Sequence, residues 1–165
     1  MAATVEIHEM SALSTGVDKT GDTIRMKSAD ENTVDNNNRL QIPGSGSNYS
    51  YTKQLRAYVA VDPTTDLTNL EAYSDGNNGY GTGIGLQYDV QSSFQTQQNT
   101  DIAGTDIFTK TSGSPIDMDS GDTQFLNGEA PAYWGSLLRI QMSIASTASP
   151  GSLGEENITF SYDET

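Results

Sequence analysis

The clearest pattern in the chain is a strict alternation of apolar and polar residues, which recurs in several short segments. Apolar residues occupy every second position over residues 84–90, 138–144 and 158–162. A period of two is typical of a β-strand with one buried and one solvated face. No segment of ten or more residues carries the 3.6-residue apolar stripe of a helix. The pattern therefore predicts an all-β protein, a single antiparallel β-sandwich of jelly-roll-like type.

The order of these segments suggests two hairpins. A strand over residues 69–73 precedes an acidic, glycine-rich turn, and we expect it to pair with 84–90. The strand at 138–144 is followed by a loop that contains Pro150-Gly151, so we expect it to pair with 158–162.

The connection "DGNNGYGTGIG" at residues 75–85 has three other interpretations. Its glycine spacing does not fit the dinucleotide fingerprint, and it lacks the lysine of a P-loop. Asp75, Asn77 and Gly79 imitate the first half of a calcium loop, but the sixth-position glycine and twelfth-position glutamate are missing. The run is more typical of a wide connection whose glycines let another element approach closely.

A further extended segment begins at residue 49. Lys53 interrupts its apolar face, so we expect a bulge or an exposed strand end there. The residues that share this face are Tyr49, Tyr51, Leu55, Ala57, Val59 and Val61.

The first 48 residues are less regular. We divide the chain into an N-terminal arm, residues 1–48, and a sandwich domain, residues 49–165. The arm has short strand candidates at 5–7 and 23–27 and a polar loop at 28–38. Its apolar residues are spread thinly and cannot offset the ordering cost of roughly 1–2 kcal/mol per residue. We expect part of the arm to order only against another subunit, by adding a strand to a neighbouring sheet.

Charge and composition narrow the function. The chain carries a net charge of −14, and its eight basic residues are scattered, which disfavours nucleic acid and anionic membranes as partners. It has no cysteine, so disulfides and thiol chemistry are excluded. The sequence starts without a signal-peptide pattern and has no apolar segment of membrane-spanning length. We expect a protein that is made and kept in the cytosol, or that leaves the cell by lysis or assembly rather than by secretion.

Candidate catalytic chemistry is sparse. His8 is the one histidine, and a Ser-His-Asp triad would have to use it. A histidine on the polar side of a short terminal strand is more typical of a protein surface. A carboxylate pair could be assembled by the fold, but nothing marks out two particular acids. We therefore expect a non-enzymatic protein with no catalytic residues and no cofactor.

The densest group of acids lies in "DMDSGD". Asp117, Asp119 and Asp122 could bind a hard structural cation through oxygen, although the set lacks a full complement of ligands. The alternative is a solvated acidic turn.

Aromatic residues suggest contacts with partners. We expect Tyr49, Tyr51 and Tyr80 at an interface, and Trp134 as a core or interface anchor. A carbohydrate-binding module would instead need exposed, coplanar rings, drawn from Tyr73, Tyr80, Tyr133 and Trp134.

Three stretches resemble a family of small virion structural proteins of tailed bacteriophages. They are "IPGSGSNYSYTKQLRAYV", "LTNLEAYSDGNNGYGTGIGLQY" and "WGSLLRIQMSIASTASPGSLGEENITFSYDE", which together span residues 42–164. The resemblance lies in strand and turn phrases. It implies a β-sandwich located in the virion, in the role of a capsid decoration (cement) protein. We expect such a protein to bind the major capsid protein on the outer capsid surface as a homotrimer. A carbohydrate-binding module, or a neck or tail component, is the alternative.

Overall fold

A computed structural model describes residues 2–119, 121, 123–151 and 153–165 of the chain. Antiparallel strands form two sheets that face each other across an apolar core, so the predicted all-β sandwich is confirmed. The described residues include one short 3-10 helix, η1 (Ile107–Thr109). No described helix is long and apolar enough to cross a membrane.

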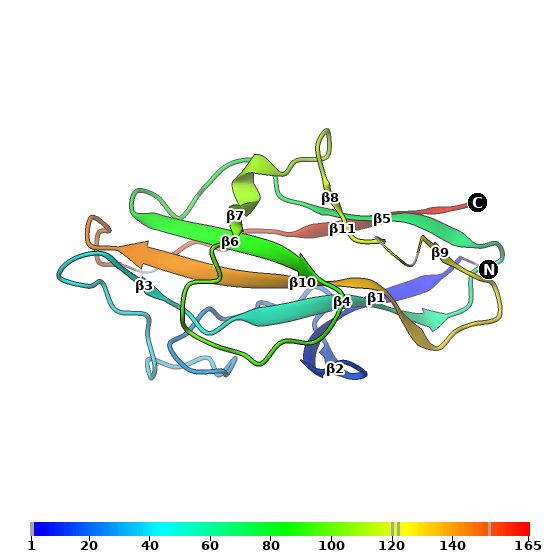
Figure 1. Cartoon of the computed structure of the whole chain (residues 1–165), viewed down its shortest axis with the longest axis horizontal. Helices are drawn as coiled ribbons and strands as arrows, with labels where there is room; N and C mark the ends of the chain where they lie inside the picture. Colours follow the sequence, from blue (N-terminus) through cyan, green and yellow to red (C-terminus); the bar gives the residue numbers. More distant parts are fainter. Residues whose placement is uncertain (1, 120, 122, 152) are drawn as a thin grey trace.

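The larger sheet has the strand order β2-β1-β4-β10-β6-β7, and β3 also pairs with β10. The long strand β10 runs through its middle (Figure 1). The bounds are β1 Thr4–Ala12, β2 Thr15–Asp18, β3 Ser47–Tyr49, β4 Lys53–Val61, β6 Ile84–Gln91, β7 Thr105–Asp106 and β10 Ala132–Ala145.

The smaller sheet has the order β11-β5-β8, and β9 also pairs with β5. It packs on one face of the larger sheet, where Phe125 and Tyr162 contact Trp134 of β10. Trp134 was expected as a core or an interface anchor, and because it is fully buried it is a core residue. The bounds are β5 Leu67–Tyr73, β8 Ile116–Asp117, β9 Gln124–Phe125 and β11 Thr159–Glu164.

Both predicted hairpins are wrong. β5 lies in the smaller sheet and β6 in the larger one, and β11 and β10 are divided in the same way. The connections at 75–83 and 146–158 therefore cross from one sheet to the other. A period of two identifies the buried face of a strand but carries no information on its partner. The close approach expected of the glycines is confirmed, because a Cβ on Gly83 would lie 2.6 Å from the Ala148 nitrogen.

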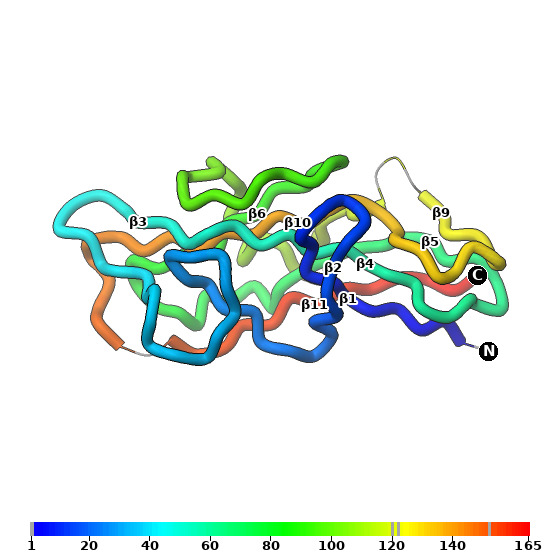
Figure 2. Tube along the Cα trace, turned by 90° about the horizontal axis from the view of Figure 1, so that it is seen from below, coloured from blue at the N-terminus to red at the C-terminus, as the bar shows by residue number. Residues whose placement is uncertain are grey.

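The first strand of the predicted arm belongs to the sandwich. β1 pairs with β4 of the same chain, with Val5 opposite Val59 and Ile7 opposite Ala57. The expectation that residues 5–7 order only on another subunit is therefore wrong, because the edge of β4 is available within the chain. Residues 23–27 form no strand. Instead, Ile24, Met26, Leu40 and Ile42 pack against the core from an irregular segment that winds past the sheets (Figure 2).

Two buried lysines hold this irregular segment. Lys53 is 1% exposed, and its Nζ lies 2.9 Å from Glu9 Oε1 on β1 and 2.9 Å from Asp30 Oδ1. The expected bulge or exposed end at Lys53 is therefore wrong. The apolar stem of the residue completes the β4 face, and its ammonium group is neutralised by two carboxylates.

Lys27 is also buried and fixes the polar loop 28–38. Its Nζ contacts Glu31 Oε1 and Asp35 Oδ1 at 2.8 Å and the Thr33 carbonyl at 3.0 Å. The hydrogen bonds with Asp35 and Glu31 raise the pKa of Lys27. The acids that marked this segment as a polar loop in the sequence are therefore the groups that attach it to Lys27.

We expect Lys53→Met to lower the free energy of unfolding by about 3 kcal/mol, because Glu9 is left as an unpaired, largely buried carboxylate. Urea denaturation at neutral pH measures the loss. Lys19→Met is the matched control. Lys19 pairs with Asp22, whose side chain is 63% exposed, so this substitution should change stability by less than about 0.5 kcal/mol. Equal losses in the two variants would contradict the role of the buried pair.

Candidate functional site

The outer face of the larger sheet is covered by the loop of residues 92–104, the covering loop. This loop crosses in front of β10 and β4 (Figure 1). Gln54 Nε2 donates to the Gln95 carbonyl at 2.5 Å, and the Gln95 amide donates back to Gln54 Oε1 at 2.9 Å. Gln141, which is fully buried, donates to the Thr100 carbonyl and accepts from the Ile102 amide. Amide side chains therefore perform here the role that apolar contacts perform in the core.

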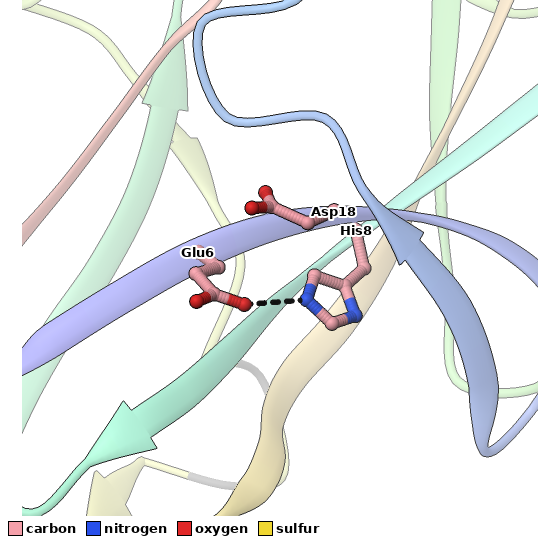
Figure 3. Close-up of side chains that lie close together, drawn as sticks. All are labelled: Glu6, His8 and Asp18. Atoms are coloured by element: carbon pink, nitrogen blue, oxygen red, sulfur yellow. Dashed lines mark hydrogen bonds and ion pairs between the residues drawn. The ribbon is translucent and has the colours of Figure 1, made fainter.

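Beside the covering loop, three potential metal ligands lie on the same outer face. Glu6, His8 and Asp18 each offer one ligand atom, and these atoms all lie within 4.8 Å of one another (Figure 3). We call them the His8 cluster. His8 Nε2 contacts Glu6 Oε2 at 2.9 Å, and His8 Nδ1 lies 3.0 Å from the Tyr133 hydroxyl. Asp18 stays anionic because hydrogen bonds from Thr20 lower its pKa.

The hairpin of β1 and β2 folds closely over this cluster. A Cβ on Gly16 would lie 2.9 Å from His8 Cβ and 3.0 Å from the Tyr133 hydroxyl, so a larger residue would lift β2 away. As a result His8 is only 8% exposed, and the expected surface histidine is wrong. The outward direction expected for His8 is correct, since Glu6 lies on the same side of β1.

Sequence reasoning missed this cluster. The spacing of Glu6 and His8 placed both on one strand face, which was a visible signal. Asp18 comes from β2, which contains a single apolar residue, Val17, and therefore gives no alternating pattern. The cluster becomes recognisable only once the β1–β2 register is known.

Two of the three acids expected to bind a cation are brought together. Asp117 and Asp119 line a small pocket of about 230 Å³, and Glu71 of β5 joins them from the adjacent strand. Asp117 Oδ1 accepts from the Asp119 amide at 3.1 Å. Asp122 lies outside the described residues. The two carboxylates thus share a pocket with a third that the sequence could not indicate.

Burial raises the pKa of Asp119, and the neighbouring Asp117 raises it further. Hydrogen bonds from the backbone of Asn69 and Leu70 act in the opposite direction. The folded protein therefore holds a proton on this carboxyl more tightly than the unfolded chain does, and ionisation of Asp119 weakens the fold.

A larger pocket of about 490 Å³ lies at the end of the sandwich near β3. Tyr49, one of the expected interface residues, is part of its wall, and its hydroxyl donates to Asp101 Oδ2 at 2.9 Å. That hydrogen bond raises the pKa of Tyr49, whereas donors from Gln87 and Ala103 lower the pKa of Asp101. The remaining lining is mainly polar: Ser28, Leu40, Gln41, Ser47, Asn48, Asn99 and Thr100.

The other two tyrosines expected at an interface are partly buried within the chain, and their contact with a partner stays a prediction. Tyr51 is half-buried, and its amide donates to the Lys27 carbonyl. Tyr80 is half-buried and packs edge-on against Phe108 of η1. Burial and nearby Glu156 raise the pKa of Tyr80 to about 12. Neither residue is a fully exposed ring.

Comparison with protein-family models found no match, and neither curated proteins nor solved structures gave a significant one. The candidate sites therefore rest on the geometry of this chain.

We expect Asp119→Asn to raise the thermal midpoint at pH 7 by about 1 °C, because the amide resembles the protonated carboxyl that the folded state prefers. The folded pKa is raised, so the penalty is present at neutral pH and disappears below the unfolded value of about 4. Melting curves at pH 7 and pH 3 measure this difference.

Asp22→Asn is the control, since it removes one negative charge at an exposed position. An equal gain in this variant would show that general charge repulsion is the cause. A gain for Asp119→Asn that persists at pH 3 would contradict the prediction in another way, because it would show that the effect does not depend on ionisation of Asp119.

Proposed function

We propose that the chain is a virion structural protein of a tailed bacteriophage. In this proposal it decorates the capsid, binds assembled major capsid protein on its outer surface, and stabilises the lattice as a homotrimer. It acts by adding interface area and carries out no reaction of its own. The resemblance over residues 42–164 supports this proposal, because its phrases coincide with the strands and sheet-crossing connections of the sandwich.

The observation that carries the proposal is the outward face of the smaller sheet, which we call the small-sheet face. Leu70 and Ala72 of β5 point into the core, so Glu71 and Tyr73 point outward. Ser161 and Thr159 of β11 lie opposite them. Asp117 and Asp163 are exposed at the edges of the same region. This surface is polar, carries several carboxylates and lies on paired strands, so its charge can complement that of a basic partner.

The other sheet faces are occupied by the chain itself. The outer face of the larger sheet lies under the covering loop and the β1–β2 hairpin. Its inner face lies against the smaller sheet and the irregular segment after β2. The small-sheet face is therefore the sheet face that the described residues leave open to a partner, and its carboxylates suit one that presents lysine and arginine. Repetition on a symmetric lattice multiplies weak contacts of this kind.

The pocket beside Tyr49 favours a second candidate function, carbohydrate binding. Its wall combines an aromatic ring, a carboxylate and several amides, the groups that hydrogen-bond and stack against sugars. The aromatic platform expected earlier does not support it, because Trp134 is fully buried and Tyr133 packs beside His8 and Tyr58.

We expect purified protein to bind capsids that lack it, with a copy number that matches the capsid lattice. Glu71→Lys should weaken this binding about tenfold at low salt, because it places a cation opposite a basic partner surface. Sedimentation of capsids with labelled protein measures both quantities. Asp22→Lys is the control for the same charge reversal away from the small-sheet face.

A handful of copies at one vertex would assign the protein to the neck or tail. Failure to bind capsids at all would overturn the proposal. Equal weakening by Glu71→Lys and Asp22→Lys would show that the small-sheet face is not the surface that contacts the capsid.

For the second candidate, we expect Tyr49→Ala to abolish any glycan binding detected on an array, whereas Tyr73→Ala on the small-sheet face leaves it intact. The ring of Tyr49 supplies stacking area at the pocket, and its loss also removes the hydrogen bond from the Tyr49 hydroxyl to Asp101. An array without a hit, or a hit that survives Tyr49→Ala, would rule out this pocket as a sugar site.

A further inference from the structure

We propose that the His8 cluster, Glu6, His8 and Asp18, binds a divalent transition-metal cation, with Zn²⁺ as the best-suited ion. The bound ion would clamp β2 to β1 at the edge of the larger sheet. This site is separate from the small-sheet face and from the Tyr49 pocket.

The strand register brings the three ligands together. His8 and Asp18 are direct cross-strand partners in the β1–β2 pair, and such partners have Cβ atoms about 4.5–5.5 Å apart. Glu6 lies two residues before His8, so it projects from the same face of β1. The ligand atoms already lie within 4.8 Å of one another, and a small rotation of exposed Asp18 would close the set.

The imidazole of His8 is held in an orientation suited to a metal ligand. Nδ1 lies 3.0 Å from the Tyr133 hydroxyl, while Nε2 points at the Glu6 carboxylate. A cation bound by Nε2 and Glu6 would replace the proton that these two groups share, while a proton on Nδ1 is donated to the Tyr133 hydroxyl, as is usual at metal-bound histidines. The ring also stacks on Tyr58 with centroids 4.5 Å apart, so little motion remains to be lost on binding.

Nearby cations are directed elsewhere. Arg56 lies opposite His8 on β4, but its Nε donates to the Gly135 carbonyl at 2.7 Å, and the guanidinium stands over the Tyr133 ring. Lys19 follows Asp18 and pairs with Asp22. Among the described residues, no ammonium group therefore lies between the two carboxylates that face the ion.

The donor set selects the class of metal. One imidazole and two carboxylates suit Zn²⁺ and related transition metals better than Ca²⁺ or Mg²⁺, which prefer oxygen alone. Three protein ligands leave a coordination position for water. A bound ion would stabilise the β1–β2 hairpin in particular, since β2 has only four residues and the hairpin leaves Leu13 and Val17 exposed.

Titration of the full chain with ZnCl₂ tests the proposal. Because His8 is the one histidine, its ring nitrogen signals in a ¹H–¹⁵N NMR spectrum are unambiguous. We expect Zn²⁺, but not MgCl₂, to shift the Nε2 signal and to bind at one ion per chain in calorimetry. A His8 spectrum that does not change with excess Zn²⁺ would overturn the proposal.

Variants separate this site from general attraction to an acidic protein. Asp18→Asn keeps the side-chain oxygen that accepts from the Thr20 amide, so the turn is preserved. We expect Asp18→Asn and Glu6→Gln each to weaken Zn²⁺ binding at least about tenfold, and Tyr133→Phe to weaken it by about tenfold. Asp22→Asn should bind like the unmodified chain. Equal weakening by Asp22→Asn and Asp18→Asn would overturn the proposal.

Discussion

The buried ion pairs of Lys53 attach the N-terminal part of the chain to the sandwich. Lys53 comes from β4, Glu9 from β1, and Asp30 from the polar loop, so one ammonium group joins three parts of the chain. An unpaired charge at this depth would be very costly, so the lysine requires both partners to be in place. The irregular segment is therefore a necessary part of the fold, and its apolar residues cover core that the smaller sheet leaves open.

Only 34% of the chain is hydrophobic, and side-chain hydrogen bonds compensate on the outer face of the larger sheet. Gln54 and Gln141 bind backbone groups of the covering loop that would otherwise be buried without partners. The polar composition thus supplies a third layer held by amides. This layer ends at the His8 cluster, where Tyr58 and Tyr133, rather than glutamines, make the contacts on the outer face of the sheet.

The sequence predicted strands and their buried faces well, because alternation over 84–90 and 138–144 directly reflects one-sided burial. It could not predict pairing, since strands of the two sheets have the same period. The sequence indicated that Lys53 interrupts the apolar face of its strand, because the carboxylates that neutralise it, Glu9 and Asp30, are distant in sequence. At the candidate sites, Asp117 and Asp119 were found because they are neighbours along the chain. Asp18 and Glu71 arrive through strand pairing, which no local pattern records.

The environment of Gln141 has a consequence for the chemical ageing of the protein. Its amide nitrogen donates to carbonyl oxygens of Ser50 and Thr100, and its oxygen accepts from Gln87 and Ile102. Deamidation would place a carboxylate against those carbonyl oxygens at a fully buried position, where an unpaired charge is very costly. Full burial keeps the hydrolytic water away from the same amide. The position that could least tolerate this damage is thereby the one best protected from it.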